Sequence, residues 1–74
     1  MRKLTLTDEQ RQIALEQIKT YFYEERDEQI GELQSRLLLD FIIEKVGPQI
    51  YNQAIVDMQK YMSERVEDMY AYML

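Results

Sequence analysis

With 74 residues the chain forms a single domain, residues 1–74, and the absence of Cys and His excludes disulfides and zinc sites built on thiolate or imidazole. A net charge of −5 argues against binding to DNA, RNA or anionic membranes, because these polyanions attract basic surfaces. A core in so short a chain contributes only about 3–5 kcal/mol, so oligomerisation is the remaining route to extra stability.

The first predicted helix covers about residues 8–25, and residues 3–6 before it alternate in the manner of a short strand. Thr7 and Gln10 have the spacing of a capping box, in which each side chain satisfies a backbone N–H of the other residue. At 100° per residue one face of this helix is apolar, and its members are Ala14, Leu15, Ile18, Tyr21 and Phe22. This face is expected to pack inward.

An acidic connection follows the first helix and contains Glu24, Glu25, Asp27 and Glu28. Carboxylates are the ligands that a hard cation such as Ca²⁺ or Mg²⁺ prefers. The segment lacks the alternating acidic positions and the turn glycine of a calcium loop. We therefore favour a solvated connection and predict no metal.

The second predicted helix covers about residues 31–46 and is apolar on most of its circumference, which is typical of a central helix. Its polar strip consists of Glu32, Arg36, Asp40 and Glu44, each four residues apart. This spacing predicts ion pairs between Glu32 and Arg36 and between Arg36 and Asp40. Gly47 is expected to form a left-handed cap, and Pro48 to begin a new helix.

Asp40 lies inside the most apolar segment of the chain and has two interpretations. It is either an acid with a shifted pKa at a functional site or a member of the polar strip paired with Arg36. The second interpretation is favoured.

The third predicted helix covers about residues 48–73, and roughly 26 residues at 1.5 Å rise span about 40 Å. One of its faces is apolar and carries Tyr51, Ala54, Ile55, Met58, Tyr61, Met62, Val66, Met69, Tyr72 and Met73. The two earlier helices, at about 24 Å each, are too short to cover this face beyond Met62. Such a patch is rare on monomers and predicts a partner. The candidate residues for self-association are Met58, Tyr61, Met62, Val66, Met69, Tyr72 and Met73.

Tyr51 and Asn52 are further candidate positions near the start of the third helix. Asn is a mediocre helix former and lies here on the flank of the apolar face. A structural hydrogen bond is the favoured role, and contact with a ligand or a partner is the alternative.

Four short motifs give the chain a recognisable pattern: Tyr21-Phe22-Tyr23-Glu24, Ile30-Gly31-Glu32-Leu33, Leu37-Leu38-Leu39-Asp40-Phe41 and Gly47-Pro48-Gln49-Ile50-Tyr51-Asn52-Gln53. With them the chain resembles, over nearly its whole length, the small bacterial proteins grouped as domain of unknown function 2164. The last motif is the most specific part of the resemblance. Ala54 stands where the family is expected to carry Gly, which weakens any expectation of close backbone approach there. The resemblance implies a bacterial, cytoplasmic protein with no assigned activity.

The residues supply no constellation for catalysis, since His and Cys are absent and no Ser stands beside a base. No stretch approaches the roughly 18 apolar residues of a membrane span. We therefore predict a non-enzymatic, cytoplasmic, all-α interaction module without a cofactor, whose first expected partner is a second copy and whose second is an unidentified protein.

The alternative function is that of a ribbon-helix-helix type DNA-binding regulator. In that fold paired strands from two subunits enter the major groove, so Lys3, Thr5 and Thr7 would contact DNA. The acidic net charge and the long third helix argue against it.

Overall fold

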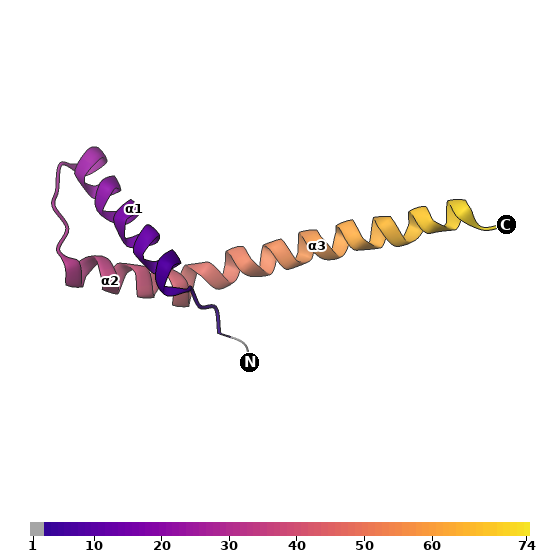
Figure 1. Ribbon diagram of the computed structural model, residues 1–74, viewed down its shortest axis with the longest axis horizontal. Helices are drawn as coiled ribbons and strands as arrows, with labels where there is room; N and C mark the ends of the chain where they lie inside the picture. Colours follow the sequence, from indigo (N-terminus) through magenta and orange to yellow (C-terminus); the bar gives the residue numbers. More distant parts are fainter. Residues whose placement is uncertain (1–2) are drawn as a thin grey trace.

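The computed structural model describes residues 3–74, which form two helical segments arranged as an L-like, elongated shape (Figure 1). The first segment is helix α1 (Asp8–Arg26). The second is one long helix composed of α2 (Glu32–Phe41), a π-helical stretch η1 (Ile42–Val46), α3 (Gly47–Met69) and a final 3₁₀ turn η2 (Tyr70–Tyr72). The described chain measures 64 × 30 × 20 Å along its principal axes. None of its helices is long and apolar enough to cross a membrane.

Helix α1 begins where the sequence predicts. The Thr7 Oγ1 accepts a hydrogen bond from the Gln10 N–H at 3.2 Å, and the Gln10 Oε1 accepts one from the Thr7 N–H at 3.0 Å, so the capping box is confirmed. The helix ends at Asp27, whose left-handed backbone (φ 52°) lets its N–H donate to the Phe22 carbonyl. An extended connection then leads to α2.

The predicted break between a second and a third helix is wrong, because α2, η1 and α3 are continuous. Gly47 has φ −55° and ψ −42°, which is right-handed helical rather than a left-handed cap. The Gly47 N–H donates to the Ile42 carbonyl five residues earlier, the hydrogen bond of a π-turn. Pro48 lacks an N–H and its ring crowds the carbonyl four residues earlier. The wider π-turn directly before Pro48 lets the chain continue as a helix through this position.

Gly47 is also the point where the N-terminal segment touches the long helix. A Cβ at this position would lie 2.5 Å from Leu4 Cδ2 and 3.2 Å from the Ile42 carbonyl oxygen. A larger residue here would therefore require the Leu4 side chain to move away from the π-turn. Gly47 is therefore the position where the Leu4 side chain approaches the backbone of the long helix, and it does not end a helix.

The predicted strand over residues 3–6 is absent from the described chain, where residues 3–7 are extended but unpaired. Leu4 and Leu6 are half-buried, whereas Lys3 and Thr5 between them are exposed. The alternation of apolar and polar residues therefore does not indicate a strand here. It serves side-chain packing on the helices instead of a sheet.

Helix α1 packs against α2 through a very small core. Leu15 and Leu39 are buried, Ser35 is fully buried, and half-buried Ile18, Phe22 and Leu38 surround them. The Ser35 Oγ donates to the Glu32 carbonyl oxygen at 2.9 Å, so its buried hydroxyl is satisfied. A small residue at this position allows the two helices to approach closely. Tyr21, predicted on the inward face, is more than half exposed.

The long helix runs far beyond this core. Among the described residues, α1 packs against α2 and makes no packing contact with α3 (Figure 1). The radius of gyration is 18.9 Å, against about 11 Å for a compact domain of this length. A single copy is therefore not a globular domain.

Candidate functional site

Helix α3 contains no buried residue. All seven residues predicted to mediate self-association are exposed, with fractions between 53% for Val66 and 85% for Tyr72. The sequence predicts that the two earlier helices cover the first half of this helix and leave only Met62–Met73 open. That expectation is wrong, because α2 continues end to end into α3 and neither α1 nor α2 lies beside it. The uncovered surface begins already near Ile50.

Most of the apolar residues from Ile50 to Met73 gather on one side of the helix, and this surface is called here the α3 stripe. At 100° per residue they fall within an arc of about 160°, the width of a core-facing helix surface. The stripe consists of Ile50, Tyr51, Ala54, Ile55, Met58, Tyr61, Met62, Val66, Met69, Tyr72 and Met73. Met adapts to irregular surfaces, and Tyr has an apolar body with a polar tip, so both are common at interfaces.

Two charged residues lie within the arc of the α3 stripe: Arg65 near its centre, and Asp68 at its edge in line with Ile50. The Arg65 guanidinium stands over the Tyr61 ring at 5.2 Å from the ring centroid, and its Nε donates to the Tyr61 hydroxyl at 3.1 Å. This contact is a cation–π interaction that lays the Arg flat on the stripe. Arg and Tyr are the residue types enriched among the residues that dominate binding energy.

A second uncovered apolar surface lies on α2, on the side that does not face α1. Its members Leu33, Leu37 and Phe41 follow one another at intervals of four residues and are more than half exposed. The second helix thus has apolar residues both on the side that packs against α1 and on the opposite, uncovered side. The prediction that it is central is wrong, because α1 covers only one of its sides.

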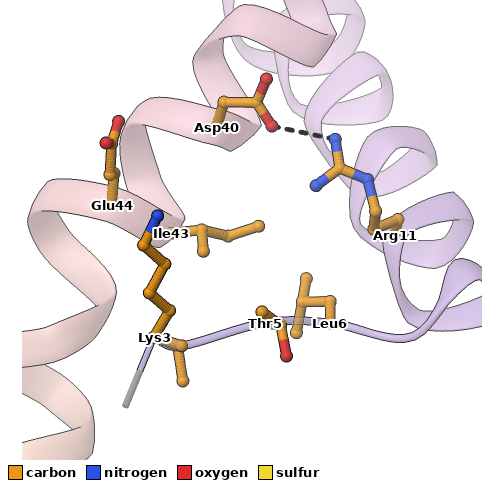
Figure 2. Close-up of a pocket in the computed structure, with 8 residues that line it drawn as sticks. Lys3, Thr5, Leu6, Arg11, Asp40, Ile43 and Glu44 are labelled. Atoms are coloured by element: carbon orange, nitrogen blue, oxygen red, sulfur yellow. Dashed lines mark hydrogen bonds and ion pairs between the residues drawn. The ribbon is translucent and has the colours of Figure 1, made fainter. Parts of the chain in front are cut away.

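The N-terminal segment, α1 and the π-turn enclose an open pocket of about 510 Å³, lined by Lys3, Leu4, Thr5, Leu6, Arg11, Asp40, Ile43 and Glu44 (Figure 2). The Arg11 Nη2 and the Asp40 Oδ1 form an ion pair at 2.9 Å across its rim. The predicted Arg36–Asp40 pair is wrong. The Asp40 carboxylate turns toward α1 instead, where Arg11 is available.

Lys3 and Glu44 complete the polar lining of this pocket. Figure 2 shows the Lys3 side chain extending toward Glu44 and Ile43. The pocket thus holds two cations and two carboxylates. The ion pair between Arg11 and Asp40 joins α1 to α2 at this pocket, and the half-buried Leu4 and Leu6 pack the N-terminal segment beside it.

Glu32, at the start of α2, connects α2 to α1 at the end of the helix pair that lies away from Arg11 and Asp40. Its carboxylate accepts a hydrogen bond from the Lys19 Nζ on α1 and another from the Arg36 Nε at 3.2 Å, so the predicted Glu32–Arg36 pair is confirmed. The hydrogen bond and the positive charge of Lys19, with a smaller contribution from Arg36, lower the pKa of Glu32 below its ordinary value. The causes are those of a surface ion-pair network.

Tyr51 and Asn52 flank a second hollow, which is also lined by Lys3, Leu4, Thr5 and Pro48. The N-terminal segment therefore reaches as far as the first turn and a half of α3. Lys3 and Thr5, the residues expected to contact DNA under the alternative function, line these hollows. Thr7 serves as the N-cap of α1.

The acidic residues around the end of α1 are exposed and spread apart. Asp27 forms the C-cap, and Glu28 pairs with the Arg26 Nε at 3.5 Å. In the part of the chain that the structure describes, no three acidic side chains converge to hold a metal ion.

Sequence reasoning missed three structural residues: Ser35, Arg11 and Leu4. Ser35 stands in an otherwise apolar helix face, and a small residue there is a usable signal for close helix packing. Arg11 and Leu4 act through contacts with residues far along the chain, Asp40 and Gly47. Local periodicity contains no information about such contacts.

Comparison with known proteins places the chain in a family. The family model described as "Uncharacterized conserved protein (DUF2164)" matches residues 4–74, which is nearly the whole chain. No curated protein and no solved structure matches significantly.

Proposed function

The chain belongs to the uncharacterised family of domain of unknown function 2164, and we propose that it functions as a non-catalytic helical module that associates with a second copy of itself. The observation that carries this proposal is the fully uncovered α3 stripe on a helix that contains no buried residue.

The surface area of the single chain supports the proposal. The chain exposes 7132 Å², whereas a compact protein of 9.0 kDa exposes about 4,900 Å². The excess of about 2,200 Å² is more than twice the roughly 800 Å² that one partner buries in a typical stable complex. Self-association through the α3 stripe removes much of this excess.

The buried core of one copy is too small to support the fold alone. In residues 3–74 the buried apolar side chains are Leu15 and Leu39. A chain of this size without disulfides relies on oligomerisation for stability, and a symmetric pair is the commonest form. The proposed pair therefore contributes to folding as well as to function.

The DNA-binding alternative is less well supported, because the N-terminal segment is held by contacts within the chain. Leu4 and Leu6 pack against the helices, and the Thr7 hydroxyl accepts the capping hydrogen bond from Gln10. A ribbon-helix-helix arrangement requires this segment to leave those positions and pair with a second strand. The net charge of −5 adds a general electrostatic barrier to binding DNA.

The proposal is tested by comparing two substitutions that introduce a negative charge, one on the α3 stripe and one outside it. Met62 and Val56 have nearly equal exposed fractions, 55% and 53%, but lie about 120° apart around the helix. The expected result is that Met62→Glu converts the dimer to a monomer in light scattering, while Val56→Glu leaves the dimer intact. Equal masses for the two variants and the wild type, all at 9.0 kDa, would refute the proposal.

A further inference from the structure

We infer that the two copies pair through antiparallel α3 helices, with the twofold axis between the levels of Tyr61 and Met62 and with Arg65 of each copy facing Asp57 of the other. This inference rests on the proposed self-association and adds the orientation, the register and the charged contact. Three features of the chain support it.

The extent of the uncovered stripe sets the register. At its N-terminal end the stripe is bounded by the segment Lys3–Thr5, which lines a hollow with Pro48, Tyr51 and Asn52. At its C-terminal end the last helical turn closes at Tyr72, and Met73 is extended. An antiparallel pair that covers the stripe from Tyr51 to Met73 on both copies has its axis at the midpoint, residue 62. In that register Ile55 faces Met69 of the second copy.

The charges of α3 give a register that agrees to within one residue, with the axis at Tyr61. Arg65 lies inside the stripe and Asp57 just outside its edge. Both are on the same side of the midline of the stripe, with Tyr61 midway between them. They are eight residues apart, about 12 Å along the axis, which is too far for an ion pair within one helix. Asp57 accepts only from the Gln53 amide at 3.0 Å, and Arg65 contacts Tyr61, so neither forms an ion pair among the described residues.

In an antiparallel pair, the same side of the stripe on each copy comes together. With the axis near Tyr61, Arg65 of each copy lies opposite Asp57 of the other, so the contact occurs twice. In a parallel pair, one side of the stripe meets the opposite side of the stripe on the other copy. The opposite flank carries Asn52, Gln59, Ser63 and Tyr70, which have no charge to offer Arg65. Complementary charge therefore favours the antiparallel orientation.

The placement of the N-terminal segment also favours the antiparallel orientation. The segment lies beside Pro48 and Tyr51, on or next to the stripe itself. A parallel, in-register pair would bring both N-terminal segments to the same level between the two helices. An antiparallel pair places them at opposite ends, each just beyond the tip of the other copy's α3.

Disulfide trapping tests the orientation directly, because the natural chain has no cysteine. In the antiparallel pair, a residue seven positions from the axis lies about 21 Å along the helix from the same residue of the other subunit. This is far beyond the 4.4–6.8 Å Cα separation of a disulfide. The single variants Ile55→Cys and Met69→Cys are therefore expected to remain uncrosslinked on oxidation. Met62→Cys alone, and the double variant Ile55→Cys/Met69→Cys, are expected to give covalent dimers.

The outcomes separate this inference from the proposed function. Crosslinking of each single variant, Ile55→Cys and Met69→Cys, would show a parallel pair and overturn the inference while leaving self-association intact. A Met62→Cys variant that neither crosslinks nor exceeds the monomer mass would overturn both. A charge exchange gives a second readout: Arg65→Asp is expected to weaken the dimer at least tenfold, and Asp57→Arg/Arg65→Asp to restore it. Failure of the double variant to recover would contradict the Arg65–Asp57 contact.

Discussion

Arg11 and Asp40, 29 residues apart in the chain, form an ion pair of 2.9 Å between the Arg11 Nη2 and the Asp40 Oδ1. The contact joins the first turn of α1 to the last turn of α2. It lies beside the π-turn and the N-terminal segment, and so it holds together the place where the three parts of the chain meet (Figure 2). Its partners are partly exposed, at 33% and 57% of the side chain, so its contribution is modest.

A double-mutant cycle measures this contact. We expect Arg11→Ala and Asp40→Ala to show a coupling energy of up to about 1 kcal/mol in urea denaturation at fixed protein concentration, declining as salt is added. The matched cycle uses Arg36→Ala with Asp40→Ala, the pair that helical spacing predicts. Its coupling should be near zero, since Arg36 binds Glu32 instead. Stronger coupling to Arg36 than to Arg11 would contradict the observed pairing.

Glu32 makes the α1–α2 contact sensitive to acid. Since its pKa is lower in the folded state than in the unfolded chain, the folded chain binds its proton less readily. The stabilisation is complete above about pH 4.5 and is lost as the pH falls through the lowered pKa. We expect Glu32→Gln to be less stable than the wild type at neutral pH and to approach it in acid. Thermal unfolding followed by circular dichroism from pH 7 to pH 3 measures the difference.

The charge-matched control for Glu32 is Glu24→Gln, which removes one carboxylate from the exposed end of α1. This variant retains Glu32 and its contacts with Lys19 and Arg36, so it should keep the acid-dependent loss attributed to Glu32. A Glu32→Gln variant whose stability follows the wild type in parallel over the whole pH range would disprove the assignment.

Ser35 sets the distance between α1 and α2. Because the side chain is fully buried, Ser35→Leu should force the helices apart and destabilise the chain by about 1–3 kcal/mol. Ser35→Ala keeps the volume small and loses one hydrogen bond to the Glu32 carbonyl, so it should cost about 1 kcal/mol or less. Urea denaturation of both variants at equal protein concentration gives the comparison. A Leu variant as stable as the Ala variant would mean that the helices do not pack closely here.

Features fixed by neighbouring residues were predictable from the sequence. The capping box at Thr7 and Gln10 and the Glu32–Arg36 pair involve residues three and four positions apart, and both are present. The inward face of α1 is also correct for Ala14, Leu15, Ile18 and Phe22. The all-α class follows from the same local patterns.

Features that depend on distant residues were not predictable. The Gly47-Pro48 pair normally ends a helix, and periodicity does not show that a π-turn precedes Pro48 or that Leu4 packs on Gly47. This one error changed the geometry of the site. A break at Gly47-Pro48 would let the two earlier helices cover the start of α3. Because α2 continues into α3, the whole stripe is uncovered.

The mass of the wild-type chain in solution tests the central claim most directly. Sedimentation equilibrium at micromolar concentration and neutral pH should give twice the 9.0 kDa mass of one chain, because an uncovered α3 stripe is too apolar to remain in water. A single species of 9.0 kDa throughout the micromolar range, with the helix still folded by circular dichroism, would contradict the account.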